Sequence, residues 1–201
     1  MRKIKAGMFI SLDGVVGEPQ DWHFPWFNEE MGEAVGGMLT DADTMLIGRV
    51  TYDSFAGAWP EREAAGGDDA GFAKLLGDMR KIVVSRSKLE LTWRNSEQLE
   101  GDLVEYVRKL KEEPGGTIGM SGSPSIVRQL MEAQLLDELH LLIHPVAVRT
   151  GMRLFDDGEQ LPLKVLSSTT FETGVLYVVY GPDLDPPTGG YQEAVEALPQ
   201  D

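Results

Sequence analysis

Residues 117–131, TIGMSGSPSIVRQLM, contain a short apolar strand, a turn of small residues and an amphipathic helix. Pro124 suits the first helical position, where its missing N–H is not needed, and Ser123 is placed to cap the helix. Gly122 has no side chain to fend off a ligand, and the free N–H groups of a first helical turn attract an anion. The stretch therefore predicts a strand-turn-helix unit whose turn is either a phosphate cradle or only a tight connection.

A similar turn follows a second predicted strand. Thr44–Ile47 forms this strand, and Gly48–Tyr52 leads from it into a helix. Arg49 and Thr51 lie in the turn and the first helical residues, where a guanidinium and a hydroxyl can hold a phosphate beside free backbone N–H groups. A salt-bridged surface arginine is the alternative for Arg49.

A third predicted strand lies within residues 80–87, RKIVVSRS, and ends in Ser85, Arg86 and Ser87. Two hydroxyls on either side of a guanidinium suit a phosphate monoester. Each of the three turns has an ordinary structural explanation when taken alone. Together they favour a phosphate-binding function.

The first part of the chain adds a strand and a helix to this pattern. Ile4–Leu12 is apolar enough for a central strand and runs into the turn signal Asp13-Gly14. The next segment is rich in aromatics, so we expect either a lid over a flat ligand or ordinary packing onto the domain; its rings are Trp22, Phe24, Trp26 and Phe27. Asn28 is then placed to cap a helix that ends before Asp43.

The middle of the chain is less regular. Residues 60–71 are rich in glycine, alanine and acid, so we expect a mobile loop there, followed by a helix around Phe72–Leu76. Residues 99–110 show the apolar period of a helix.

The last elements look antiparallel. Leu139–Val148 predicts a strand, and residues 163–171 and 174–181 predict a closing hairpin. Residues 182–201 hold two adjacent prolines, five acids and no base, so we expect an acidic extension outside the core. The sequence thus predicts one α/β domain over residues 1–181, followed by an extension over residues 182–201.

Composition excludes several classes of protein. No apolar run approaches the roughly 18–20 residues that cross a bilayer, so we expect no membrane span. The net charge of −15, without a basic stripe, argues against nucleic acid as a partner. There is no cysteine, and nothing at the N-terminus reads as a signal peptide, so we expect a cytoplasmic protein without disulfides.

Common catalytic motifs are also absent. There is no dinucleotide fingerprint of the Rossmann type, no Walker lysine after a glycine-rich turn and no serine-hydrolase elbow. His140 and His144 are four residues apart, but their segment predicts a strand and no third ligand is near. We therefore expect no metal site.

Several motifs, in order, resemble those of the dihydrofolate-reductase-like family that includes the reductase domain of bacterial riboflavin biosynthesis, the RibD C-terminal type. They are SLDGVVG, LIGRVTYDSF, KIVVSRS, IGMSGSPSIVRQL, LLDELHLLIHPV and GMRLF, and the resemblance covers nearly all of residues 3–180. It implies a mixed sheet flanked by helices, NADPH as hydride donor and commonly a homodimer. By resemblance, the cofactor-binding positions are Gly48, Arg49, Thr51, Ser85, Arg86, Gly122 and Ser123. Arg86 or Arg49 would then meet the 2′-phosphate.

The resemblance also suggests residues for the substrate side. Asp13 lies in the loop that lines the nicotinamide side in this family, so it is the catalytic candidate, although a turn-forming Asp-Gly is the alternative. Trp26 and Glu30 are candidate substrate contacts, yet the carboxylates after Pro25-Trp26 are not at the spacing of true dihydrofolate reductases. Met120 stands where the riboflavin reductases commonly have an acid.

These departures leave three functions open. The first is an NADPH-dependent reductase of a small planar substrate, pyrimidine- or pterin-like, resembling 5-amino-6-(5-phosphoribosylamino)uracil reductase. The second is a dimeric nucleotide-binding protein without turnover. The third is a dihydrofolate reductase.

Overall fold

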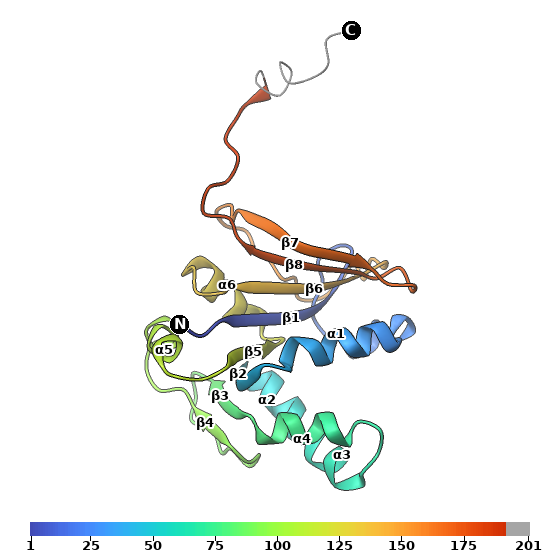
Figure 1. The fold of residues 1–201 in the computed structure, drawn as a ribbon, viewed down its shortest axis with the longest axis vertical. Coiled ribbons are helices and arrows are strands. Elements are labelled where there is room, and N and C mark those ends of the chain that lie inside the picture. Colours follow the sequence, from blue (N-terminus) through green and yellow to red (C-terminus); the bar gives the residue numbers. More distant parts are fainter. Residues whose placement is uncertain (192–201) are drawn as a thin grey trace.

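The computed structural model describes residues 1–191 and contains one mixed sheet with helices on both faces (Figure 1). In this part of the chain the sheet has eight strands in the order β4-β3-β2-β5-β1-β6-β8-β7. The strands are β1 (Ile4–Ser11), β2 (Ala42–Gly48), β3 (Arg80–Val84), β4 (Ser96–Gln98), β5 (Thr117–Ser121), β6 (Glu138–His144), β7 (Leu163–Thr170) and β8 (Leu176–Pro182). The helices are α1 (Glu29–Leu39), α2 (Arg49–Ala56), α3 (Trp59–Ala65), α4 (Ala70–Asp78), α5 (Leu103–Glu112) and α6 (Pro124–Glu132), with short 3-10 turns η1 (Pro19–Asp21) and η2 (Phe24–Trp26).

The pairing confirms the predicted fold class. Strands β4, β3, β2, β5, β1 and β6 run parallel to one another, so their carboxyl ends share one edge of the sheet. β8 pairs antiparallel with both β6 and β7, which forms the predicted C-terminal hairpin.

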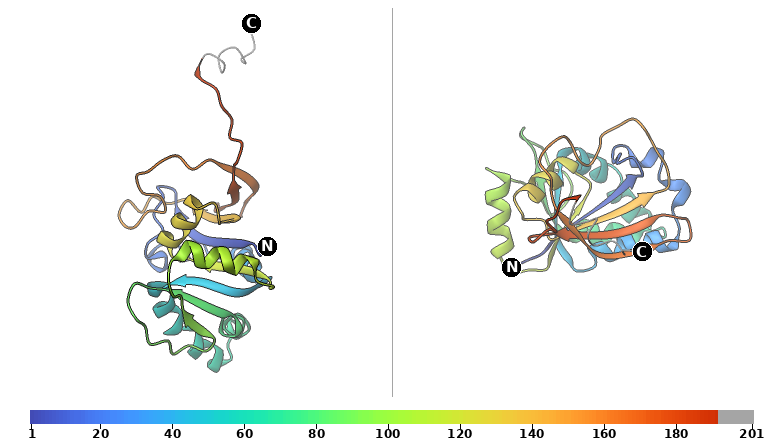
Figure 2. Two further views of the ribbon diagram at one scale, coloured as in Figure 1. Left: turned by 90° about the vertical axis from the view of Figure 1, so that its left-hand side faces the viewer. Right: turned by 90° about the horizontal axis from the view of Figure 1, so that it is seen from above.

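Side chains of alternate residues along each strand pack into separate apolar clusters on the two faces of the sheet. α5 and α6 cover one face, where Ala6, Met8 and Ile10 of β1 join the largest apolar cluster (Figure 2). On the other face, α1 packs Met31 against Leu142 of β6. α2 and α4 cover β2 and β3 on that same face through a third cluster.

Two local predictions are wrong. Residues 60–71 are not simply a loop, because α3 occupies Trp59–Ala65 and the Trp59 ring packs edge-on against Phe72 of α4 at 5.3 Å. Leu99 is not helical: it follows β4, and α5 begins only after Asp102, whose side chain accepts a hydrogen bond from the Glu105 N–H. β4 has three polar residues and so gives no apolar signal in the sequence.

The C-terminal extension is described only as far as Tyr191. Its described part leads away from the β7–β8 hairpin, with Leu184 and Tyr191 exposed (Figure 1). Residues 192–201 of the predicted extension lie outside the described residues. Among residues 1–191, no helix has the length and apolarity needed to span a bilayer.

Candidate functional site

The three predicted phosphate-binding turns lie side by side at the carboxyl edge of the parallel strands. β3, β2 and β5 are consecutive neighbours, so residues 85–87, 48–51 and 121–123 emerge from adjacent positions. The structure therefore brings all seven residues predicted to bind a cofactor to one edge of the sheet. Ligands of open α/β sheets bind at this edge.

Hydrogen bonds join the second and third of these turns. The Ser123 hydroxyl accepts a hydrogen bond from the Gly48 N–H at 2.7 Å, and it lies 3.1 Å from the Thr51 hydroxyl. Gly122 has φ +74°, and a Cβ built there would lie 3.3 Å from the Thr51 hydroxyl oxygen. A side chain at this position would thus be strained and would fill space beside the start of α6. These four residues form what we call the cradle.

Ser123 does not cap α6 as predicted. It occupies the N-cap position but adopts left-handed φ 61° and ψ 60°, and its side chain makes no cap hydrogen bond. The reason is the competing contact with Gly48, which is 75 residues away and not visible from local sequence. Pro124 is at the first helical position, as predicted. Without side-chain caps, the starts of both α2 and α6 retain N–H groups and positive dipole ends that favour an anion.

Arginine side chains border the cradle on the β3 side. Arg49 donates to the Ser87 hydroxyl at 3.3 Å, and Ser87 lies 3.3 Å from the Ser85 hydroxyl. Arg49 also pairs with Asp53 at 3.4 Å, but both side chains are more than half exposed, so the pair is weak. Arg86 is exposed and makes no hydrogen bond or ion pair with the described residues. Both guanidinium groups can therefore turn toward an anion at small energetic cost.

β1 and β5 separate at the cradle. Their pairing ends where Gly7 lies opposite Ser121, and the Gly122 N–H donates to the Gly7 carbonyl at 3.3 Å. β1 nevertheless continues to Ser11, paired only with β6. The stretch of β1 beyond the cradle thus has no strand partner on the β5 side.

Asp13, the catalytic candidate, lies at the carboxyl end of β1 and holds a neighbouring loop. Its carboxylate accepts hydrogen bonds from the Ser11 hydroxyl at 2.7 Å and from the N–H groups of Val148 and Arg149 at 3.0 and 2.9 Å. The Ser11 hydrogen bond is the main cause that holds the pKa of Asp13 below its usual value, and the two N–H groups add to it. Asp13 is therefore ionised near neutral pH, and this geometry suits loop anchoring better than proton donation.

The predicted substrate residues lie on the α1 face. The Glu30 carboxylate accepts hydrogen bonds from the Asn28 side chain at 2.9 Å and the Glu172 N–H at 2.8 Å, so it ties the start of α1 to the β7–β8 turn. Asn28 also caps α1 as predicted, by accepting from the Met31 N–H. The Trp26 ring is half-buried and lies nearly perpendicular to the His144 ring, with 5.9 Å between the centroids.

Two buried histidines were not selected from the sequence. His144, at the end of β6, is fully buried, and His23 in the aromatic segment is 5% exposed. The His144 Nε2 and His23 Nδ1 atoms have no hydrogen-bond partner. No local signal distinguishes them, because His144 lies inside the predicted strand 139–148 and the pairing of the two rings depends on how the segment around His23 folds. Among residues 1–191, no group of three or more histidine and acidic side chains could hold a metal ion.

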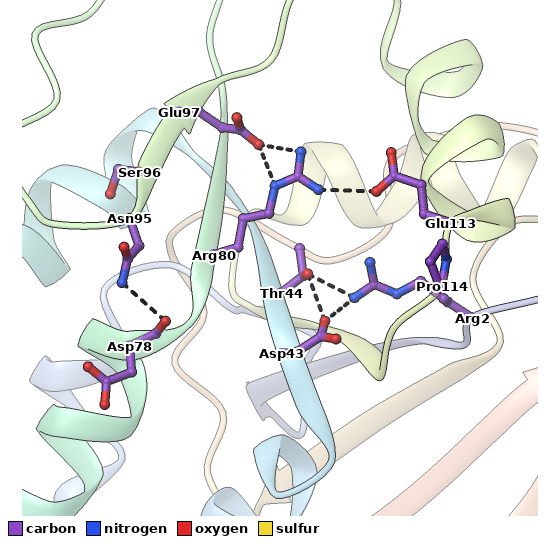
Figure 3. A pocket seen from close by; sticks show the side chains of 10 residues that line it. All are labelled: Arg2, Asp43, Thr44, Asp78, Arg80, Asn95, Ser96, Glu97, Glu113 and Pro114. Carbon is purple, nitrogen blue, oxygen red and sulfur yellow. Dashed lines mark hydrogen bonds and ion pairs between the residues drawn. The ribbon is translucent and has the colours of Figure 1, made fainter.

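A polar depression of about 590 Å³ lies at the opposite edge, where the strands begin (Figure 3). Its arginines are already neutralised: Arg2 pairs with Asp43, and Arg80 pairs with Glu97 and Glu113. The depression is therefore far from the cradle and has no free cation for a phosphate.

Several known proteins are similar to this chain in sequence or in structure. The sequence profile of the RibD C-terminal domain matches residues 2–177. The uncharacterized protein YyaP of Bacillus subtilis is 30% identical over 180 residues, which span 89% of this chain and 94% of that protein. A putative riboflavin biosynthesis protein from Shewanella sp. PV-4 has a similar structure, with a TM-score of 0.69, 17% identity and coverage of 90% and 99% of the two chains.

The structure is also similar to dihydrofolate reductase from Enterococcus faecalis, solved in complex with NADP(H) and a compound named RAB-propyl. The TM-score is 0.58 at 13% identity, and the match covers 90% of this chain and 96% of the enzyme. The dihydrofolate-reductase-like fold predicted from the sequence is thereby confirmed. The profile match over most of the chain and the relative in Bacillus subtilis show that this chain belongs to the RibD C-terminal domain family.

Proposed function

We propose that the chain is an NADPH-dependent reductase of a small planar heterocycle, with the cofactor phosphates at the cradle. The observation that carries this proposal is the set of three adjacent strand ends, in which Gly48, Thr51, Gly122 and Ser123 are in contact and Arg49 reaches toward Ser87. When bound, NADPH supplies the hydride, and the protein contributes binding and orientation.

The residues present suit this cofactor. Gly122 leaves room for a pyrophosphate to approach the backbone, and a Cβ at Gly48 would lie 3.1 Å from the Ser123 hydroxyl, so both glycines keep the cradle open. Arg49 and Arg86, with the hydroxyls of Ser85 and Ser87, offer charge-assisted donors for a 2′-phosphate. Solved relatives of the same fold include a dihydrofolate reductase in complex with NADP(H).

Turnover is tested with two substrates. We expect NADPH oxidation in the presence of either 5-amino-6-(5-phosphoribosylamino)uracil or dihydrofolate, and the faster of the two identifies the substrate class. A non-catalytic nucleotide-binding protein is the second candidate, favoured by the carboxylates of Asp13 and Glu30, which are both engaged in structural hydrogen bonds. If the protein binds NADPH but oxidises it with neither substrate, that second candidate is established.

The choice of cofactor is tested by binding. We expect NADPH to bind more tightly than NADH, and the double replacement of Arg49 and Arg86 by alanine to remove most of that preference. Hydrogen bonds to a charged group contribute about 1.5–3 kcal/mol, so the expected loss is roughly 10- to 100-fold in NADPH affinity. Arg62→Ala is the matched control. Arg62 lies in α3, away from the cradle, and like Arg49 it is about half exposed and paired with one aspartate, Asp69.

Fluorescence titration of both cofactors decides the outcome. Equal affinity of the parent protein for NADPH and NADH, or an unchanged preference in the double variant, would contradict the placement of the 2′-phosphate. Sedimentation or light scattering of the same samples tests the further proposal that the chain, which we place in the cytoplasm, forms a homodimer, as the family resemblance implies.

A further inference from the structure

The aromatic segment 19–27 covers the buried His144 side chain with aromatic rings. Four rings meet the His144 imidazole nearly at right angles: Trp22 at 5.2 Å, Phe9 at 5.8 Å, and His23 and Trp26 at 5.9 Å between centroids. Three of these rings come from the segment, and Phe9 comes from β1. We call this arrangement the aromatic box.

His144 presents an unused acceptor inside the box. Its Nδ1 lies 2.8 Å from the Leu142 carbonyl oxygen, which can only accept, so Nδ1 carries the proton. Burial lowers the pKa of His144 below 6.5, against the opposing effect of the Leu142 and Ile10 carbonyls, so the ring is neutral at physiological pH. Nε2 is then a buried lone pair without a partner. Because buried polar atoms are normally paired, this atom marks a place for a ligand donor.

His140 on the same strand shows the ordinary case. Its Nδ1 lies 2.7 Å from the Tyr177 hydroxyl, and its Nε2 lies 3.1 Å from the Glu138 carboxylate. Both nitrogens of His140 are thus satisfied within the protein, whereas His144 keeps one nitrogen open.

His23 occupies a slot that suits a flat ring. Its imidazole stacks on Phe9 with 4.2 Å between centroids and 13° between planes, and the Phe24 ring lies tilted against it by 36°, also with 4.2 Å between centroids. The slot is close to the cradle, since Phe9 is two residues along β1 from Gly7, which contacts Gly122. Two residues of a strand span about 7 Å.

The segment can move without breaking hydrogen bonds to the rest of the domain. In the described part of the chain, every hydrogen bond of residues 19–27 ends within residues 17–27, including the one from the Trp22 indole to the Gly17 carbonyl. Phe24 and Phe27 are 61% and 48% exposed. The segment is therefore held against the rest of the domain by the packing of its rings and by no hydrogen bond from residues 19–27 of the described chain.

We propose that a flat heterocyclic substrate replaces the His23 imidazole on Phe9 and donates a ring N–H to His144 Nε2. This inference rests on the proposed reductase function and specifies the substrate as a heterocycle with a ring N–H. His144 would be a specificity-determining residue, and His23 would hold the slot closed in the absence of substrate.

The test compares two probes that differ in their ring N–H groups. 5,6-Diaminouracil has them, whereas 1,3-dimethyl-5,6-diaminouracil carries methyl groups instead. Binding to the NADPH-loaded protein is followed by tryptophan fluorescence, because Trp22 and Trp26 contact His144 and move with the segment. We expect the first probe to bind at least about tenfold more tightly, the effect of one well-formed hydrogen bond.

Variants then assign the preference to His144. His144→Phe should remove the difference between the probes, and His144→Gln, which restores an acceptor, should retain it. His140→Phe is the matched control and should leave the difference unchanged. His23→Ala should strengthen binding of 5,6-diaminouracil several-fold, because the ring no longer competes for the slot.

Three results would overturn the inference: no binding of 5,6-diaminouracil at millimolar concentration, equal binding of both probes, or a difference that persists in a folded His144→Phe protein. The probe comparison on the parent protein does not depend on the folding of any variant. Failure of the proposed function is distinguished by a separate NADPH titration, since loss of cofactor binding refutes that function, whereas normal NADPH binding with any of the three results refutes only the role of His144.

Discussion

Gly122→Val tests whether the cradle binds the cofactor. Gly122 has φ +74°, a region that a β-branched residue enters at a cost of about 1–3 kcal/mol. Its Cβ would lie 3.3 Å from the Thr51 hydroxyl oxygen, so the contact between Thr51 and Ser123 must also adjust. The branched side chain would then occupy the space beside the uncapped start of α6.

Two quantities are expected to change by different amounts. For a chain of this size, 1 kcal/mol corresponds to roughly 2–4 °C, so the backbone strain should lower the Tm of the unliganded protein by about 2–12 °C. NADPH affinity should fall by at least about 100-fold, which corresponds to about 2.8 kcal/mol and to the loss of one or two charge-assisted hydrogen bonds.

Gly66→Val separates backbone strain from ligand contact. Gly66 has φ +69° at the end of α3, and a Cβ built there meets no atom within 4 Å. It should therefore lose a similar amount of stability while it binds NADPH like the parent protein. Thermal unfolding without ligand and a fluorescence titration with NADPH give both quantities. A folded Gly122→Val protein with normal NADPH affinity would refute the cradle as the phosphate site.

Two further predictions concern buried cations and protons. Lys81→Met should lower the free energy of unfolding by about 2–4 kcal/mol in chemical denaturation, because the buried ammonium donates to three carbonyls at the end of α4. The control Lys74→Met, at an exposed lysine, should lower it by less than about 0.5 kcal/mol. Equal effects of the two substitutions would contradict this role of Lys81. Burial, followed by the electrostatic effect of His144, lowers the pKa of His23 from 6.5 to about 4, so the unfolded chain binds more protons than the folded chain between these two pH values. The contribution of His23 to the free energy of unfolding should therefore be complete above pH 6.5 and should fall by about 3 kcal/mol toward pH 4. His23→Phe should lose this part of the pH dependence, and a variant that keeps it would contradict the role of His23.

Much of the fold could be predicted because its signals are local. An apolar strand followed by a small-residue turn and a helix occurs twice, a third apolar strand ends in Ser85–Ser87, and parallel pairing then places the three turns at one edge. The closing hairpin followed from two strands in succession. By contrast, β4 is short and polar, and α3 is stabilised by the packing of Trp59 against Phe72, which no local pattern reveals.

The candidate site was predictable only in part, because its details depend on contacts between distant residues. The composition of the turns was sufficient to select Gly122 and Arg49, but the left-handed conformation of Ser123 follows from its bond to Gly48. The relation between His23 and His144 likewise required the segment before α1 to fold over the end of β6. A single histidine at the end of a strand carries no such information.

β1 is the element that connects the cradle to the aromatic box. Gly7 accepts the Gly122 N–H, Phe9 stacks on His23, and Ser11 donates to Asp13, and all three side-chain positions lie on the α1 face because alternate residues of a strand point the same way. A Cβ at Gly7 would overlap the sulfur of Met38 in α1. A larger residue there must push aside the end of the Met38 side chain, which packs against β1 at this position. Because a strand rises by about 3.3 Å per residue, the step from Gly7 to Phe9 sets a spacing of about 7 Å between the cradle, where we place the cofactor phosphates, and the ring slot, where we place the substrate.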